Sequence, residues 1–81
     1  MTEYKHLTID EENGRAYLLG YDMLLAPIEF TVLCAIASGE DTSGYHALSV
    51  HVYAINRRAE SIGGRKLLLS CEQGYCLNEF M

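Results

Sequence analysis

The chain has 81 residues, 49% of them hydrophobic, and a formal net charge of −5 at pH 7. This length allows a single small domain over residues 1–81, which buries only about 60% of the surface that its unfolded chain exposes. The acidic balance argues against tight, nonspecific binding to nucleic acid, because domains of that kind are usually basic overall. No apolar run approaches the ~18 residues of a membrane span, and the N-terminal stretch lacks the apolar region of a signal peptide. We therefore expect a cytoplasmic domain without a membrane partner.

The first 25 residues are typical of a small antiparallel meander. The stretch KHLTID places Leu7 and Ile9 on one face, which is the period of a strand. Asn13-Gly14 follows as a hairpin signal, because both residue types tolerate a positive φ. Two more short strands are predicted in RAYLL (15–19) and YDMLL (21–25).

A central helix is predicted over residues 27–38. Pro27 is favoured in a first helical turn, and Glu29 lies where the helix dipole favours a carboxylate. The surface of this helix is apolar nearly all round. One stripe at helical spacing consists of Ile28, Val32, Ala35 and Ile36. The turn-rich stretch SGEDTSG ends the helix.

A second helix is predicted from Tyr45 to Ile62, with Gly63-Gly64 as its stop. Apolar residues recur at alternating steps of four and three residues, which places them on one buried stripe of the helix. They are Leu48, Val52, Ile55, Ala59 and Ile62. The opposite face carries Val50, Tyr53, Ala54, Arg57 and Ser61. Asn56 and Arg58 flank that outer face on either side.

The chain is predicted to end in a hairpin, with strands over Lys66–Glu72 and Tyr75–Phe80. Gln73-Gly74 is the expected two-residue turn. With this turn, Glu72 faces Tyr75 and Cys71 faces Cys76 across the ladder.

Three stretches in this order resemble the C-terminal DNA-binding domain of OmpR/PhoB-type response regulators. They are LAPIEF (25–30) at the first helix, LSVHVYAINRRA (48–59) at the recognition helix and SCEQGYCL (70–77) at the wing. The resemblance implies an α+β, winged-helix-like fold with an N-terminal antiparallel meander, a shortened helical core and a C-terminal β-hairpin wing. It also implies a domain of a two-component system that binds double-stranded DNA in transcriptional control. Helix 45–62 would enter the major groove, and hairpin 66–80 would be the wing.

The chain departs from this family between its two helices. Only GEDTSGYHA (39–47) is available where the family has a helix and a loop. The positioning helix is therefore absent or reduced to a turn, and apolar surface on helix 27–38 or 45–62 should lie open. An exposed apolar patch on so small a domain favours an interface. We expect a homodimer or another protein partner to cover it.

The expected DNA-contacting face also departs from the family. Tyr53, Ala54 and Asn56 stand where related recognition helices carry arginines. Alanine cannot replace a bidentate contact to guanine, which contributes about 1–3 kcal/mol of discrimination. The counterpart of the wing arginine is Glu72, a carboxylate that should repel phosphates.

Basic and aromatic residues remain as candidates for contacts with DNA, and each also has a purely structural interpretation. Arg57 and Arg58 either contact DNA or form a solvated helix face, and Arg58 alternatively pairs with Glu72. His51 is either a phosphate contact or a partly buried histidine. The candidate DNA-binding residues are His51, Tyr53, Arg57, Arg58, Arg65 and Lys66. The competing hypothesis is a degenerate winged-helix module for protein interaction or dimerisation.

Three cysteines, an odd number, do not form a disulfide framework. Cys34 lies in the apolar run FTVLCAIA and is expected to be a buried structural thiol. Cys71 and Cys76 could form a transient disulfide, whereas their spacing lacks the second ligand pair of a zinc site. No nucleophile elbow or phosphate loop occurs. We therefore expect no enzyme, no cofactor, no metal and no small-molecule substrate.

Overall fold

The computed structural model describes residues 1–79 of the chain. A four-stranded antiparallel sheet comes first, in the order β1-β2-β3-β4, and two helices and a two-stranded hairpin follow. The elements are β1 (Thr2–Tyr4), β2 (Leu7–Asp10), β3 (Arg15–Leu18), β4 (Tyr21–Asp22), α1 (Pro27–Ala37), α2 (Leu48–Gly63), β5 (Leu68–Cys71) and β6 (Gly74–Leu77).

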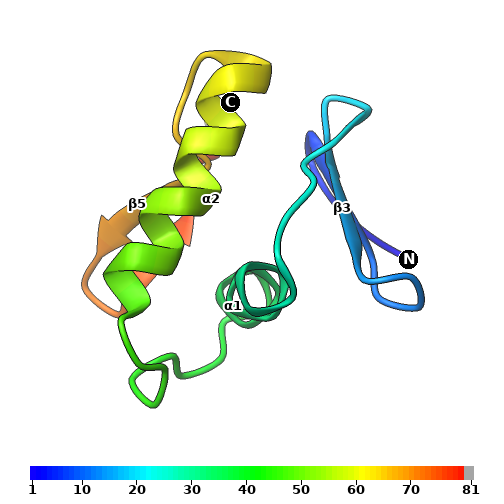
Figure 1. Cartoon of the computed structure of the whole chain (residues 1–81). Coiled ribbons are helices and arrows are strands. Elements are labelled where there is room, and N and C mark those ends of the chain that lie inside the picture. The colour runs from blue at the N-terminus through cyan, green and yellow to red at the C-terminus, as the bar shows by residue number, and fades with distance from the viewer. Residues whose placement is uncertain (80–81) are drawn as a thin grey trace.

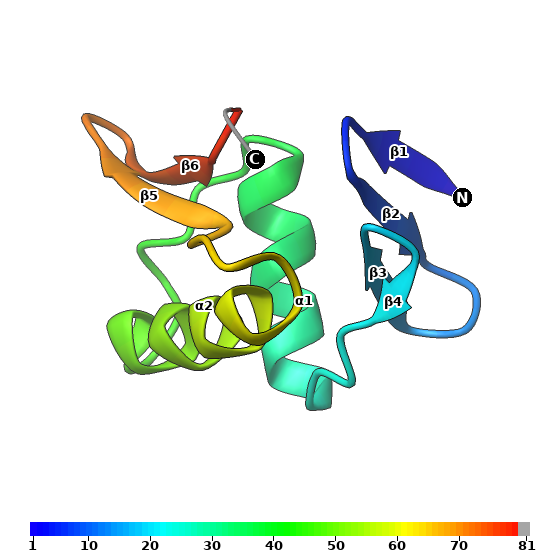
Figure 2. The ribbon, with the colours of Figure 1, turned by 90° about the horizontal axis from the view of Figure 1, so that it is seen from above.

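The central helix α1 lies between the N-terminal sheet and a second unit made of α2 and the β5–β6 hairpin (Figures 1 and 2). The hairpin runs beside α2 on the same side of α1 (Figure 1). This order and arrangement confirm the expected α+β, winged-helix-like fold with a meander, a shortened helical core and a C-terminal hairpin.

The N-terminal sheet packs one face against α1. Leu7 pairs with Leu18 and Ile9 with Ala16, so these four side chains share a face, and all are buried. The predicted strand period is thus confirmed for Leu7 and Ile9. The turn between β2 and β3 contains Asn13, whose side-chain amide donates to the Asp10 carboxylate at 2.8 Å.

The sheet differs from the prediction at its two edges. A first strand, β1, pairs with β2 and was not predicted. Lys5 and His6, expected within a strand, form the turn between β1 and β2. The predicted strand 21–25 is reduced to Tyr21–Asp22, because the chain turns away from the sheet after Met23, at Leu24, which has a φ of 53°.

Helix α1 begins at Pro27, as predicted. The Glu29 carboxylate accepts a hydrogen bond from the Ala26 N–H at 2.9 Å, which satisfies one of the free donors at the start of the helix. The prediction for Ile28 was wrong. Its side chain is 43% exposed, because the first turn of α1 extends beyond the parts of the sheet and α2 that cover the later turns.

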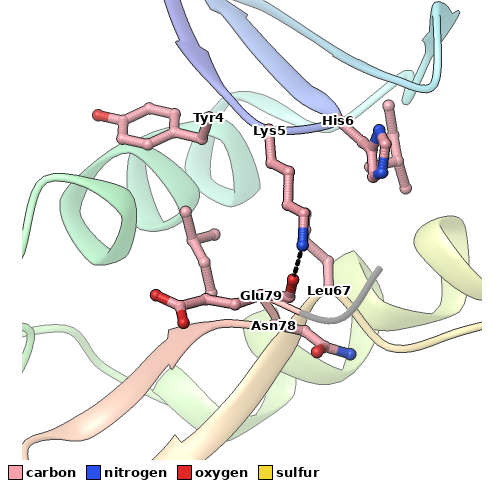
Figure 3. A pocket seen from close by; sticks show the side chains of 8 residues that line it. Tyr4, Lys5, His6, Leu67, Asn78 and Glu79 are labelled. Carbon is pink, nitrogen blue, oxygen red and sulfur yellow. Dashed lines mark hydrogen bonds between the residues drawn. The ribbon is translucent and has the colours of Figure 1, made fainter.

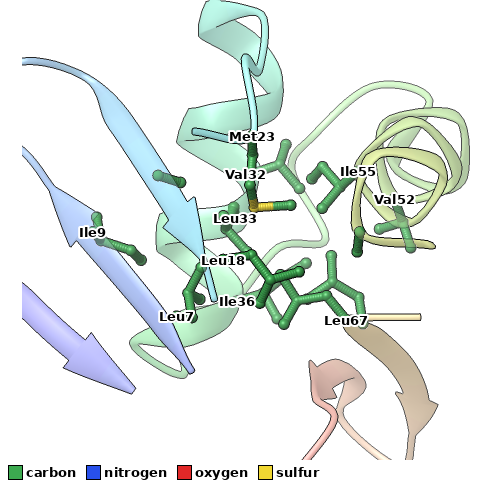
Figure 4. Close-up of a cluster of buried hydrophobic side chains, with 13 residues drawn as sticks. Leu7, Ile9, Leu18, Met23, Val32, Leu33, Ile36, Val52, Ile55 and Leu67 are labelled. Carbon is green, nitrogen blue, oxygen red and sulfur yellow. The ribbon is translucent and has the colours of Figure 1, made fainter. Parts of the chain in front are cut away.

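One hydrophobic core joins all three parts of the fold (Figure 4). Side chains from the sheet, α1, α2 and the start of β5 converge around Leu33, which is fully buried. The predicted stripe of α2 belongs to this core, with Val52, Ile55 and Ala59 buried and Leu48 and Ile62 partly buried. At about 25 cal/mol per Å² of apolar surface removed from water, this shared core is the main stabilising contribution.

A connecting segment without a helix, residues 38–47, joins α1 to α2. The shortened helical core is therefore confirmed, since this segment is fully described. Thr42 is buried within it and lies close to Gly74 of the hairpin. Helix α2 begins at Leu48 and not at Tyr45, because residues 45–47 form turns and Ala47 adopts a left-handed φ of 55°. Gly64 ends α2 with a φ of 75°, as the Gly-Gly signal predicted.

The hairpin exists as predicted, but its predicted register was wrong. Leu69 pairs with Cys76 and Cys71 with Gly74, so the turn is Glu72–Gln73 and not Gln73-Gly74. Cys71 therefore does not face Cys76, and Glu72 does not face Tyr75. Beyond the strands, the Asn78 N–H donates to the Leu67 carbonyl at 2.7 Å, which holds this register. The predicted end of the hairpin at Phe80 lies outside the described residues.

Candidate nucleic-acid interface

The outward face of α2 presents an aromatic and a cationic side chain side by side. Because the stripe through Ile55 is buried, Tyr53 and Arg57 on the opposite side of α2 face the solvent. The Tyr53 side chain is 63% exposed. The Arg57 Nη1 donates to the Tyr53 hydroxyl at 3.2 Å. The guanidinium carbon lies 5.9 Å from the Tyr53 ring centroid, within the range of a cation–π interaction. The phenol therefore holds the guanidinium against the helix surface.

A shallow groove of about 230 Å³ runs between α2 and the hairpin. Tyr53 and Lys66 both line it, and Ser49 and Ser70 add hydroxyl groups. Arg57 is bonded to Tyr53, and Tyr53 and Lys66 line the same groove, so the three residues make up a strip from the outer face of α2 to the base of the hairpin. We call this strip the α2–hairpin groove face; its polar groups are hydrogen-bond donors of the kind that contact phosphates.

Asn56 forms the floor of the groove and connects α2 to the hairpin. Its amide Nδ2 donates to the Leu68 carbonyl at 2.9 Å, and its Oδ1 accepts from the Leu68 N–H at 2.8 Å. The sequence placed Asn56 at the edge of the solvent-exposed face, and that placement was wrong, since the residue is buried. A four-residue step from buried Val52 to Asn56 is the signal that could have placed it inward. Asn56 therefore sets the position of the hairpin and is not free to contact a base.

Arg58 and His51 lie on the other flank of α2. Arg58 is rotated from Arg57 by about 100° around the helix axis, away from the hairpin, and His51 precedes Arg58 by two turns. Arg58 is exposed and His51 is half-buried. The two residues do not join the groove face, so the structure divides the predicted cluster between two sides of one helix.

The connection from α2 to β5 carries the two remaining candidates, and both Arg65 and Lys66 are exposed. The Lys66 carbonyl accepts a hydrogen bond from Asn78 Nδ2 at 2.9 Å, which fixes the backbone at this point. At the opposite end of the hairpin, the turn exposes Glu72. Cationic groups therefore lie at the base of the hairpin and an anionic group lies at its tip.

Apolar side chains are open to solvent on α2, as expected, and on the hairpin. Val50 on α2 is 62% exposed, and Leu69 on β5 is 37% exposed. A second group surrounds the β3–β4 turn and the start of α1 and consists of Leu19, Tyr21, Leu24 and Ile28.

A separate cavity of about 380 Å³ lies between the β1–β2 turn and the segment after β6 (Figure 3). Leu18, Leu67 and Leu77 supply its apolar walls. The Lys5 ammonium donates to the Glu79 carbonyl across the opening and so ties the sheet to the end of the described chain. The sequence did not predict this cavity, because its walls come from both ends of the chain.

The three thiols differ in exposure. Cys34 on α1 was expected to be buried but is half-buried against the core, and this burial raises the pKa of its thiol. Cys71 is exposed and Cys76 is half-buried. A hydrogen bond with the Cys71 thiol is the main cause that raises the pKa of Cys76.

The fold and the groove face define the class of this protein as a small winged-helix-like domain. No protein-family model matches the chain, and no curated protein matches it. The resemblance to OmpR/PhoB-type domains is therefore an interpretation of three short stretches of sequence. Across residues 1–79, no cluster of His, Cys, Asp and Glu is arranged to hold a metal ion. In the same range, neither helix has the length and apolarity needed to cross a membrane.

Proposed function

We propose that this chain is a DNA-binding domain of a transcriptional regulator, with α2 in the major groove and the hairpin beside it as a wing. The observation that supports this proposal is the α2–hairpin groove face. Arg57 and Tyr53 lie on the exposed surface of α2, and Lys66 lines the groove together with Tyr53. A solvent-facing helix with cationic groups along one flank is the geometry with which winged-helix domains contact a duplex.

The proposed mode of binding is mainly contact with phosphates. Asn56 is engaged with Leu68, and Ala54 has no polar side-chain atom, so neither reads a base. Arg57 exchanges its Tyr53 partner for a phosphate oxygen, and Lys66 contacts the same strand from the base of the hairpin. Because few groups remain for base contacts, we expect weak discrimination between sequences.

Electrostatics limit the affinity of this binding. The net charge of −5 opposes the approach of a polyanion, and Glu72 at the hairpin tip does so at short range. Each phosphate that the protein neutralises contributes about −0.9 to the slope of log K against log salt concentration. Two or three such contacts correspond to a slope of about −2 to −3. Binding should therefore be measurable only at low salt.

A fluorescence anisotropy titration of a labelled random duplex, at several salt concentrations, tests the proposal. Arg57→Ala and Lys66→Ala should each weaken binding and reduce the magnitude of the slope by about one unit. Glu72→Gln should strengthen binding. Glu12→Gln, which makes the same charge change in the exposed β2–β3 turn, is the matched control and should have a much smaller effect. Absence of binding at the lowest salt concentration would refute the proposal.

A protein-interaction or dimerisation module is the second candidate function. It is favoured by Val50 and Tyr53, which are 62% and 63% exposed and lie three residues apart on one face of α2. Light scattering over a range of protein concentrations distinguishes the two functions. A mass that doubles with concentration, and that returns to the monomer value in Val50→Ser, would support this candidate. A monomer at every concentration would exclude self-association.

A further inference from the structure

The hairpin places two of the three cysteines next to each other on one face. Cys76 lies opposite Leu69, and Cys71 is two residues after Leu69 on the same strand. Side chains two residues apart point to the same side of a strand, so Cys71 and Cys76 are diagonal neighbours. The third cysteine, Cys34, is on α1 and does not belong to the hairpin.

The two hairpin thiols also differ in a way that suits sequential chemistry. Cys71 is exposed near the turn, where a solute reaches it directly. Cys76 is half-buried, and its thiol donates to the Leu69 carbonyl at 3.7 Å. The Cys71 thiol is the main cause that raises the pKa of Cys76, in agreement with their positions as diagonal neighbours in the hairpin. Cys71 is thus the thiol that a dissolved oxidant reaches directly, and Cys76 is the neighbour that can react with the oxidised form of Cys71.

We propose that Cys71 and Cys76 form a reversible dithiol–disulfide pair that is oxidised by hydroperoxides. The Cys71 thiolate attacks the peroxide, a sulfur–oxygen bond forms as the oxygen–oxygen bond breaks, and an alcohol or water leaves after protonation. The Cys76 thiolate then attacks the sulfur of the Cys71 sulfenic acid. The sulfur–sulfur bond forms as the sulfur–oxygen bond breaks, and the leaving hydroxide takes up the proton that Cys76 released on ionisation and becomes water. Overall, two thiols lose two electrons and two protons to one peroxide.

The register makes this disulfide strained. Diagonal residues have Cα atoms about 7–8 Å apart, whereas an unstrained disulfide joins Cα atoms about 4.4–6.8 Å apart. A slide of β6 by two residues would bring Cys71 opposite Cys76 and keep every side chain on its present face. That slide breaks the bonds of Asn78 to Leu67 and Lys66. Because oxidation costs either strain in the present register or these hydrogen bonds after the slide, the disulfide is more readily reduced than one in an undisturbed site, which suits the pair to switching and not to permanent cross-linking.

The experiment treats the full chain with one equivalent of hydrogen peroxide and follows its intact mass. Disulfide formation removes two hydrogens, so the expected change is a loss of about 2 Da that dithiothreitol reverses. Proteolysis after Glu72 separates the two cysteines and identifies the linked peptides. Cys34→Ser should oxidise like the natural chain, whereas Cys71→Ser and Cys76→Ser should not form the intramolecular bond.

A second measurement tests the displacement of β6. Exchange of the Asn78 amide proton with solvent deuterium should become at least tenfold faster after oxidation, because its hydrogen bond to Leu67 is lost. The proposal is overturned if no mass is lost, if the linked peptides contain Cys34, or if oxidation yields only covalent dimers. Unchanged exchange at Asn78 in the oxidised protein would contradict the displacement. None of these results depends on whether the domain binds DNA.

Discussion

Replacement of Asn56 by leucine is expected to destabilise the whole domain and release the hairpin from α2. Asn56 is 7% exposed, and its two hydrogen bonds satisfy both backbone groups of Leu68, which is 2% exposed. Leucine has a similar volume but leaves the Leu68 N–H and carbonyl without partners. Each buried polar group without a partner costs about 1–3 kcal/mol, so the expected loss is about 2–4 kcal/mol after partial rehydration of the hairpin.

A loss of this size is a large part of the total free energy of unfolding of the domain. A domain of this length has a free energy of unfolding of about 4–12 kcal/mol, and 1 kcal/mol shifts the Tm by about 4–8 °C. Thermal unfolding followed by circular dichroism should therefore show a decrease in Tm of at least about 8 °C. Glu60→Leu, on the exposed side of the same helix, is the matched control and should change stability by less than about 0.5 kcal/mol.

A second variant tests the hydrogen-bond argument itself. Asn56→Asp preserves shape, but an ionised carboxylate can accept from the Leu68 N–H and repels the Leu68 carbonyl. A protonated carboxyl can make both bonds, so the folded state raises the pKa of this carboxyl above its value in the unfolded chain. The destabilisation relative to the natural chain should therefore be largest near pH 7 and decrease as the pH falls through the folded pKa. If the free energy of unfolding of Asn56→Leu lies within about 0.5 kcal/mol of that of the natural chain, the structural role assigned to the Asn56 amide is wrong.

Two further predictions concern the core and the effect of acid. Ile55→Ala should cost about 2–5 kcal/mol in urea unfolding, because Ile55 is fully buried, whereas Ile28→Ala at a 43% exposed site should cost far less; equal losses would contradict the placement of α1. Hydrogen bonds lower the pKa of four carboxyl groups in the folded chain, so their contribution to stability is present at neutral pH and is lost as the pH falls below about 4. A urea midpoint that stays constant from pH 7 to pH 3 would contradict this assignment, which rests on Asp10, Glu11, Asp22 and Asp41.

Local patterns were sufficient to predict the parts of the fold that bury one face of a single element. The alternation of Leu7 and Ile9 and the stripe through Ile55 were confirmed, because burial of one face requires that spacing in any tertiary context. Strand β1 was missed for the opposite reason. Its three residues carry no periodic apolar signal, and their pairing with β2 stabilises them as a strand. The early start predicted for α2 failed because residues 45–47 adopt turns that the apolar pattern does not encode.

The hairpin register could not be decided from the two strands alone. A shift of two residues leaves every side chain on the same face, so the predicted and observed registers satisfy the same alternation. Contacts from elsewhere in the fold select between them, namely the bond from Asn78 to Leu67 and the clamp of Asn56 on Leu68. The candidate DNA-binding residues on α2 do not lie together either, because neighbours in sequence point in different directions on a helix. Arg57 and Arg58 are adjacent in sequence but lie about 100° apart around α2.

An NMR titration of the isotopically labelled chain with a short random duplex at low salt tests whether α2 and the hairpin form the DNA interface. Chemical-shift changes should concentrate at Tyr53, Arg57 and Lys66 and leave the N-terminal sheet little affected, and added salt should reverse them. Changes confined to the sheet around β1, or no changes at millimolar duplex concentration, would contradict the assignment of α2 and the hairpin as the interface.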